Sequence, residues 1–463
     1  MADPHGRPPH AETRRLAAFA AAIDPASLPP AVVERARQVV ADSLACGVAG
    51  FTLEPEIVEP LHRYLATLAA PGPATILGTG QRVQPQVAAL ANGTTMHTID
   101  YDDTHMASIA HFGASVTAAA LAAVERRGGS GAELCAAVVA GFEVGGKIGR
   151  AVMPGHYQRW HSTASLGGLA AAGAAARGLG LDEEGVDVAI GFAGDDTGGT
   201  RYCIKVGDFT KSLHAGTAAW KGVQGALLAE AGAGGPTGLL EQPVGFCWAY
   251  SDERDARRLG PELDTLGTRW EVLDDDIKAH PCILSSHTAI EGTLVLLERH
   301  GLVARDLAAI RLTQPPYSPQ HGMNYEPDSP MAARLSVPFC VAIAALDGAV
   351  GLTQFEDERF LRPDVRELMR KVTLEQTEEL AIRYPATTPT IVELETTGGD
   401  VFREEVGRPR GAHDRPLTDD EHRDKLEELL SRTLDPAAAA ELLDALSRLD
   451  RLADVRELTA LLA

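Results

Sequence analysis

The chain has 463 residues, of which 45% are hydrophobic, and this is enough for two domains, one of which can interrupt the other along the chain. Acidic residues outnumber basic ones by 64 to 42, which gives a formal net charge of −22. This charge argues against a nucleic-acid or anionic-membrane partner, because such partners attract clustered Lys and Arg. An anionic substrate would therefore need a locally basic pocket.

The cysteines and the apolar segments indicate the compartment. The six cysteines lie far apart and form no Cys-x-x-Cys pair, so disulfides and structural zinc are not expected. Residues 1–13 are polar and do not resemble a secretory signal. The apolar stretches at 114–124 and 166–176 are shorter than the ~18 continuous apolar residues of a membrane span. We therefore expect a soluble, cytoplasmic protein.

Helices are expected over most of the chain, and strands only in its second half. Apolar residues recur at helical spacing in residues 30–44, 56–68, 87–92, 115–126, 132–153, 162–177, 184–192, 212–230 and 284–299. Alternating or β-branched patterns at 309–314, 390–397 and 401–406 predict strands of a smaller α+β domain. Thr418 and Glu421 have the spacing of a capping box, which opens a helix near the C-terminus.

Several familiar catalytic motifs are absent or incomplete. Residues 141–147 match the glycine and lysine spacing of a phosphate-binding loop, but Ile148 stands where the magnesium-binding Ser or Thr is needed, and the segment is predicted as mid-helix. Neither a Gly-x-Ser-x-Gly nor a His-Glu-x-x-His motif occurs. Any chemistry must therefore come from dispersed side chains.

The densest polar segment runs from His97 to His105 and is followed by His111. It contains the three carboxylates of Asp100, Asp102 and Asp103. Their mutual repulsion is costly unless nearby cations or hydrogen-bond donors stabilise the charges. Three interpretations are open: caps for a helix starting near residue 115, a magnesium site, or a site of proton transfer with the flanking histidines.

A second histidine and a group of cations are also candidates. His161 precedes a small-residue helix, where it is either a binding residue or a simple cap. Four cations, Arg201, Lys205, Lys211 and Lys221, face only Asp208 in their segment, which suggests a wall that binds carboxylates. Lys278 is either a surface lysine or a cation that faces this wall across a crevice between domains.

Five segments in register resemble the MmgE/PrpD family, which includes 2-methylcitrate dehydratase, cis-aconitate decarboxylase and iminodisuccinate epimerase. The resemblance covers about residues 11–432. It rests on residues 91–104 (ANGTTMHTIDYDDT), 141–145 (GFEVG) with 160–163 (WHST), 211–222 (KSLHAGTAAWKG), 277–282 (IKAHPC) and 333–338 (ARLSVP).

The resemblance implies a mainly α protein with a large helical domain and a smaller α+β lid. The implied division is 1–268 for the first part of the helical domain, 269–408 for the lid and 409–463 for helices that complete the helical domain. It also implies a homodimer without a cofactor or metal. The implied site residues are Asp100, Thr104, His111, His161, Lys211 and Lys278. His105, and Tyr325, which stands near the position of an active-site tyrosine of the decarboxylases, are added as substrate-binding candidates.

The family's reactions move a proton at a carbon beside a carboxylate, so cations must stabilise the charge that develops there. We expect Lys211 and Lys278 to hold a small anionic polycarboxylate while His111 and His161 act as base and acid in an order left open. Asp100 would orient an imidazole and Thr104 would bind the substrate. Dehydration of a hydroxylated di- or tricarboxylate is the first expectation, with decarboxylation and epimerisation as alternatives. The rivals are a binding protein without turnover and a metal-dependent hydrolase.

Overall fold

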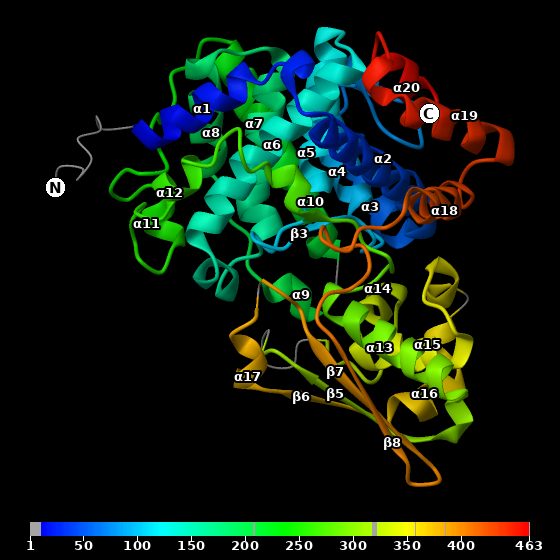
Figure 1. The fold of residues 1–463 in the computed structure, drawn as a ribbon. Coiled ribbons are helices and arrows are strands. Elements are labelled where there is room, and N and C mark those ends of the chain that lie inside the picture. Colours follow the sequence, from blue (N-terminus) through cyan, green and yellow to red (C-terminus); the bar gives the residue numbers. More distant parts are fainter. Residues whose placement is uncertain (1–10, 207–208, 317–321, 357, 385, 463) are drawn as a thin grey trace.

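The computed structural model describes residues 11–206, 209–316, 322–356, 358–384 and 386–462. The described chain is mainly helical with a small sheet in its second half, so the expected fold class is confirmed. Figure 1 shows a helical lobe and, below it in this view, a sheet lobe in which helices cover a sheet. The expected boundaries after residues 268 and 408 stay predictions.

The helical lobe contains every helix that the sequence predicts between residues 30 and 230. The second helix, which begins at Pro30, continues past the predicted end at Leu44 because a run of buried small and apolar residues follows. The elements of the first 276 residues are α1 (Ala11–Ala22), α2 (Pro30–Leu53), α3 (Pro55–Leu65), β1 (Pro71–Thr75), β2 (Arg82–Val83), α4 (Pro85–Met96), β3 (Thr104–His105), α5 (Phe112–Arg127), α6 (Gly131–Val152), α7 (Ser162–Leu179), α8 (Glu183–Asp195), α9 (Tyr202–Val206), α10 (Phe209–Glu230), α11 (Phe246–Tyr250), α12 (Leu259–Leu263) and β4 (Asp275–Asp276).

Close packing of α6 on α7 explains the glycines that resemble a phosphate-binding loop. A Cβ on Gly141 would lie 2.9 Å from the main-chain oxygen of Ala170, and one on Gly145 would lie 2.7 Å from the Ala170 Cβ. Only glycine allows the two helices to approach so closely. The segment lies in the middle of α6, so the mid-helix prediction is confirmed.

The sheet lobe has a four-stranded sheet in the order β6-β5-β7-β8. Strands β5 and β6 pair in parallel, and the other neighbours are antiparallel. Its elements are α13 (Leu284–His300), β5 (Leu307–Gln314), α14 (Pro330–Arg334), α15 (Val337–Asp347), α16 (Pro363–Met369), β6 (Val372–Gln376), α17 (Glu378–Ala381), β7 (Thr390–Thr396) and β8 (Val401–Val406). The three predicted strands are confirmed, whereas β6 was not predicted because only one of its five residues is fully buried.

The last helices return to the helical lobe and pack near α2 (Figure 1). They are α18 (Asp419–Leu430), α19 (Pro436–Ser447) and α20 (Arg456–Ala460), and the predicted capping box of Thr418 and Glu421 opens the first of them. In α18, Lys425 forms an ion pair with Asp42 at 2.6 Å and donates to the Tyr101 main-chain oxygen at 2.8 Å. The C-terminal helices therefore brace the segment next to Asp100.

None of the helices in the described ranges is both long and apolar enough to cross a bilayer.

Candidate active site

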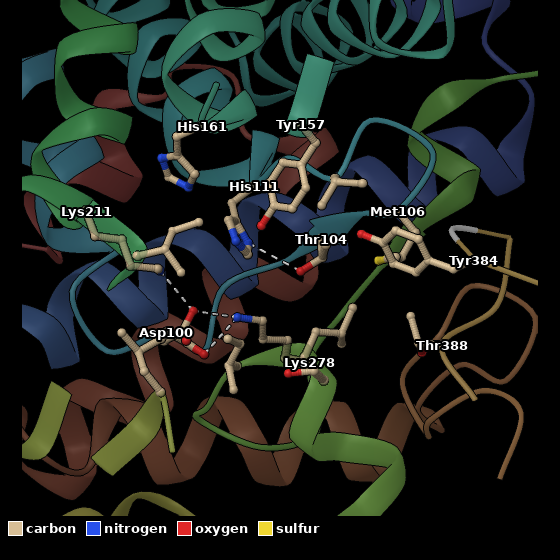
Figure 2. A pocket seen from close by; sticks show the side chains of 16 residues that line it. Asp100, Thr104, Met106, His111, Tyr157, His161, Lys211, Lys278, Tyr384 and Thr388 are labelled. Carbon is tan, nitrogen blue, oxygen red and sulfur yellow. Dashed lines mark hydrogen bonds and ion pairs between the residues drawn. The ribbon is translucent and has the colours of Figure 1, made fainter. Parts of the chain in front are cut away.

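A cavity lies between the two lobes, with about 650 Å³ of empty space including its mouth. Six of the sequence-predicted residues line it together, namely Asp100, Thr104, His111, His161, Lys211 and Lys278. Other lining residues come from both lobes: Met106, Ile109, Tyr157, Ile204, Ile283, Leu284, Ser285, Leu335, Tyr384 and Thr388. Figure 2 shows the labelled side chains around His111, with Lys211 and Asp100 on one side and Tyr384 and Thr388 on the other.

Residues that are distant in sequence meet at the cavity because each lies at or near the end of a helix or strand. The segment between α4 and α5 carries Asp100 and His111, and its short strand β3 pairs antiparallel with β4, Thr104 opposite Asp276. This pairing brings Lys278, which follows β4, beside Asp100. His161 caps the N-terminus of α7 and Lys211 lies in the first turn of α10.

One carboxylate bridges the two lysines. Oδ1 of Asp100 accepts from Nζ of Lys211 at 3.2 Å and from Nζ of Lys278 at 2.8 Å (Figure 2). All three side chains are buried, and Oδ2 of Asp100 has no hydrogen-bond partner among the described residues. Burial alone would raise the pKa of Asp100, but Lys211 and Lys278 outweigh it and hold that pKa well below its ordinary value. The trio therefore carries a net positive charge.

His97 fixes Lys211 from behind the cavity. Its Nδ1 lies 2.7 Å from Oδ2 of Asp102, and its Nε2 lies 3.0 Å from Nζ of Lys211. Because an ammonium can only donate, Nε2 of His97 must accept, and the ring proton must sit on Nδ1 and point to Asp102. Burial lowers the pKa of His97, which agrees with this neutral form.

His111 presents one free ring nitrogen. Its Nδ1 lies 2.6 Å from the main-chain oxygen of Asp103, which can only accept, so Nδ1 carries the proton. Nε2 is then left with a lone pair, as a base requires. Burial, with Lys278 the next largest cause, lowers the pKa of His111 to about 3. The imidazole is therefore neutral at neutral pH.

His161 is held by a second imidazole. Its Nδ1 lies 2.9 Å from Nδ1 of His214 in α10, so one ring donates and the other accepts. The Nε2 atom of His161 is the ring nitrogen left for a substrate. Burial, then the neighbouring His214, lowers the pKa of His161 well below its ordinary value.

The three clustered carboxylates have three different environments. Asp100 bridges the lysines, Asp102 faces His97, and Asp103 lies against Asp275. Burial and the nearby Asp102 raise the pKa of Asp103 to about 7, and burial also raises the pKa of Asp275. A site holding one magnesium ion among Asp100, Asp102 and Asp103 does not fit this arrangement. The helix-capping interpretation applies to Asp103, whose carboxylate interacts with the main chain of Gly113 in the first turn of α5.

The structure does not bring His105 and Tyr325 to the cavity. Nδ1 of His105 lies 2.9 Å from Oγ of Ser108, and its Nε2 faces the Glu271 carboxylate at 3.2 Å. The Tyr325 hydroxyl donates to the Val372 main-chain oxygen at 2.9 Å. Both predictions rest on position in the sequence, and in both cases the side chain contacts a neighbouring polar group instead.

Of the four cations expected to form a wall that binds carboxylates, Lys211 is the one that lines the cavity among the described side chains. Lys221 pairs with the exposed Asp196 at 3.5 Å, and the Arg201 guanidinium lies over the Tyr157 ring, 4.1 Å from its centre. The side chain of Lys205 and residue Asp208 lie outside the described residues. Lys278, in contrast, is buried, so the surface interpretation of this lysine is wrong.

Sequence reasoning missed several contributors. His97 and Asp102 belonged to the polar segment, but nothing in their spacing reveals that they orient Lys211. His214 lies three residues after Lys211 on the same helix, and that spacing was an available signal, because such residues share a helix face. Tyr157 and Tyr384 line the cavity without any signal in the sequence.

Comparison with known proteins agrees with this geometry. The MmgE/PrpD N-terminal domain matches residues 14–259, and the MmgE/PrpD C-terminal domain matches residues 280–451. The chain is 28% identical over 475 residues to a cis-aconitate decarboxylase-like protein, oryM, of Aspergillus oryzae, covering 97% of each chain. It is 28% identical to a cis-aconitate decarboxylase of Aspergillus terreus, covering 94% of this chain and 92% of the relative.

A human cis-aconitate decarboxylase is 27% identical over 447 residues, which cover 93% of this chain and 90% of the relative. The two family matches therefore extend over both lobes and include every residue that lines the cavity except Lys278, which lies between them. The chain belongs to the MmgE/PrpD family.

Proposed function

We propose that the protein is a lyase that forms a carbanion or enolate beside a carboxylate of a small polycarboxylic acid. One observation carries this proposal: the paired lysines on Asp100 lie in the same cavity as two neutral histidines, His111 and His161. The lysines can hold a substrate carboxylate, and they stabilise negative charge that spreads onto it in the transition state. No step in this scheme draws on a metal or an organic cofactor.

Substrate charge prepares the histidines for proton transfer. Burial of the rings lowers the pKa of both imidazoles, and the positive charge of the lysines lowers it further. A bound polycarboxylate offsets that charge, so the pKa of His111 and of His161 rises toward the ordinary value near ~6.5. One ring can then take up a proton while the other keeps a lone pair, which provides an acid and a base on one substrate.

Decarboxylation is the first candidate reaction because the relatives named above are cis-aconitate decarboxylases by name or likeness. The bond between carbon and the departing carboxylate breaks and carbon dioxide leaves. The electron pair passes to carbon conjugated with the carboxylate held by Lys211 and Lys278, and a protonated histidine then delivers one proton to carbon.

Dehydration of a hydroxylated acid, such as one resembling 2-methylcitrate, is the second candidate. It is favoured by the buried Oδ2 of Asp100, which has no partner among the described residues and can accept from a substrate hydroxyl. One histidine removes the proton beside the carboxylate, and the other protonates the departing hydroxyl, so that water leaves and an alkene forms.

Product analysis in deuterated water separates the two reactions. With cis-aconitate, decarboxylation gives carbon dioxide and one solvent deuterium on carbon of the product. With 2-methylcitrate, dehydration gives an alkene and no carbon dioxide. Exchange with inversion and no other change would instead indicate epimerisation. Absence of turnover with citrate-like, aconitate-like and amino-dicarboxylate acids by folded protein would contradict the proposal.

A matched pair of histidine variants links the activity to the cavity. His161→Gln removes a lining imidazole and should abolish turnover, whereas His300→Gln changes an exposed imidazole at the end of α13 and should not. Equal activity of both variants would contradict the roles proposed here. Turnover that survives exhaustive chelation would support a reaction without a metal.

We also propose that the protein acts as a homodimer in the cytoplasm. Support for a reducing compartment comes from its six cysteines, which are all buried and form no disulfide with one another. A two-fold pair is the commonest assembly of soluble proteins. Light scattering after gel filtration should give twice the monomer mass, and a monomer at micromolar concentration would contradict the dimer.

A further inference from the structure

A group of possible metal ligands lies beside the cavity. His161, Cys203 and His214 each offer one ligand atom, and these three atoms all lie within 4.8 Å of one another. They come from the N-cap of α7, from α9 and from α10. We propose that these three side chains form a binding site for a divalent transition metal ion such as Zn²⁺, and that metal binding there inhibits the enzyme.

Two of the three distances between the ligand atoms are close to those of a tetrahedral zinc site. Zinc bonds of about 2.0 Å to nitrogen and about 2.3 Å to sulfur imply edges of about 3.3 Å between two nitrogens and about 3.6 Å between nitrogen and sulfur. The nitrogen atoms of His161 and His214 lie 2.9 Å apart, and Sγ of Cys203 lies 3.6 Å from Nδ1 of His214. A shift of a few tenths of an ångström between the two rings would bring the distance between their nitrogens to the value that zinc requires.

Backbone contacts hold the ligands in place. The main-chain nitrogen of His161 donates to the Gly199 oxygen at 3.0 Å, and Trp160 pairs with Thr200 in an isolated β-bridge. The Cys203 thiol lies 3.4 Å from the Thr200 oxygen. The segment that carries the thiol is thus attached to the segment that carries the first imidazole, which keeps the ligands close to one another.

The donor set suits zinc and similar ions. One thiolate and two imidazoles are ligands for borderline-soft metals, while hard cations such as Mg²⁺ prefer oxygen. Binding releases the thiol proton of Cys203 to solvent. The ring that donates in the His161–His214 hydrogen bond moves its proton to Nε2, so that both Nδ1 atoms can give a lone pair to the ion. The fourth position stays open to water or a carboxylate.

Inhibition follows from the tautomer that the metal imposes. With Nδ1 on the ion, Nε2 of His161 carries a proton and has no lone pair to accept one from the substrate. His161 can then no longer accept a proton from the substrate. This consequence rests on the proposed role of His161, whereas metal binding itself does not.

Calorimetric titration of chelator-treated protein with Zn²⁺ tests the site. We expect one equivalent of Zn²⁺ to bind, and Co²⁺ to give the ultraviolet charge-transfer absorption of a cobalt thiolate. Cys203→Ser should weaken binding by roughly a hundredfold or more, the upper end of the losses seen for changes around a metal's ligands. The matched control is Cys247→Ser, which changes a buried thiol of α11 and should leave binding unchanged.

Turnover provides the second measurement. Zn²⁺ should reduce the activity of the wild-type protein in step with occupancy of the site, and a chelator should restore it. Cys203→Ser should keep its basal activity and resist the same concentration of Zn²⁺. His214→Gln, as a second ligand variant, should also lose the stoichiometric site. Unchanged Zn²⁺ affinity in Cys203→Ser, or no stoichiometric binding to the wild type, would overturn the proposal and leave the proposed lyase function untouched. Binding without any turnover would sustain the metal site and contradict the lyase.

Discussion

Asp100 and Lys278 are joined twice, because Nζ of Lys278 donates to Oδ1 of Asp100 at 2.8 Å and to its main-chain oxygen at 3.0 Å. Asp100 has a φ of 52°, in the left-handed region that Asp adopts more readily than most residues. The contact with the main-chain oxygen therefore stabilises the turn at Asp100, and the contact with the carboxylate pairs the charges of Lys278 and Asp100. Loss of the carboxylate should therefore disturb the charge balance of the cavity, while the main-chain contact remains possible.

Asp100→Asn should destabilise the fold as well as abolish activity. The substitution leaves two buried ammonium groups without their shared counter-ion, and breaking a buried ion pair costs about 3–5 kcal/mol. Urea unfolding followed by circular dichroism measures the change. Asp196→Asn is the matched control, because its carboxylate is exposed and pairs with Lys221 at the surface. Equal stability of the two variants would mean that the lysines do not depend on Asp100.

His97 should act by positioning Lys211 without touching the substrate. His97→Asn shortens the side chain so that it no longer reaches the lysine, and a misplaced lysine should reduce kcat/KM by roughly a hundredfold. His97→Gln restores an amide oxygen near the former Nε2 position, where it can accept from Lys211. Steady-state kinetics should therefore show partial rescue by Gln at similar thermal stability. Identical losses in both variants would point to a merely structural role.

The lowered pKa of His111 predicts a dependence of stability on pH. This pKa is about 3 in the folded protein, against ~6.5 in the unfolded chain, so below pH ~6.5 the unfolded state takes up a proton that the folded state cannot. Stability is therefore lost as the pH falls from ~6.5 toward 3. At pH 5 the loss amounts to at most about 2 kcal/mol.

His111→Gln should remove that part of the acid sensitivity. Urea unfolding at pH 7 and at pH 5 should show a smaller decrease for the variant than for the wild type. The same decrease in both proteins would mean that the imidazole of His111 is protonated normally in the folded state.

The raised pKa of Asp103 predicts a dependence of stability on pH with the opposite sign. Its pKa is raised to about 7, so between pH ~3.9 and 7 the folded state retains a proton that the unfolded chain has lost. Stability from this group is present at low pH and is lost as the pH rises toward 7. Asp103→Asn should be less affected when the pH rises from 5 to 8. A variant as sensitive as the wild type over this range would contradict a raised pKa of Asp103.

The sequence was sufficient where the signal is local or carried by the family motifs. Helical periodicity predicts the helices around the core, and the motif residues Asp100, Lys211 and Lys278 meet as the resemblance implied. The role of His97 depends on contacts across more than a hundred residues, and no spacing in the sequence records them. Tyr325 illustrates the converse, since a position near the family's tyrosine did not bring its hydroxyl to the cavity.

Strand β6 and the environments of the clustered carboxylates show the same limit. Strand β6 forms because its backbone pairs with β5, which is a tertiary contact rather than a property of its five residues. Asp102 and Asp103 are neighbours in sequence, yet the pKa of Asp102 is lowered and that of Asp103 is raised, because the first faces His97 and the second faces Asp275. The sequence shows that the carboxylates are crowded together, but only the fold shows which group each carboxylate faces.

The central claim is that Lys211 and Lys278 hold a substrate carboxylate between His111 and His161. A crystal structure with tricarballylate, a saturated tricarboxylate that lacks the double bond of cis-aconitate, tests it most directly. We expect a carboxylate within hydrogen-bond distance of both Nζ atoms and a ligand carbon facing Nε2 of each histidine. A ligand bound elsewhere, or an empty cavity at saturating tricarballylate, would contradict the account.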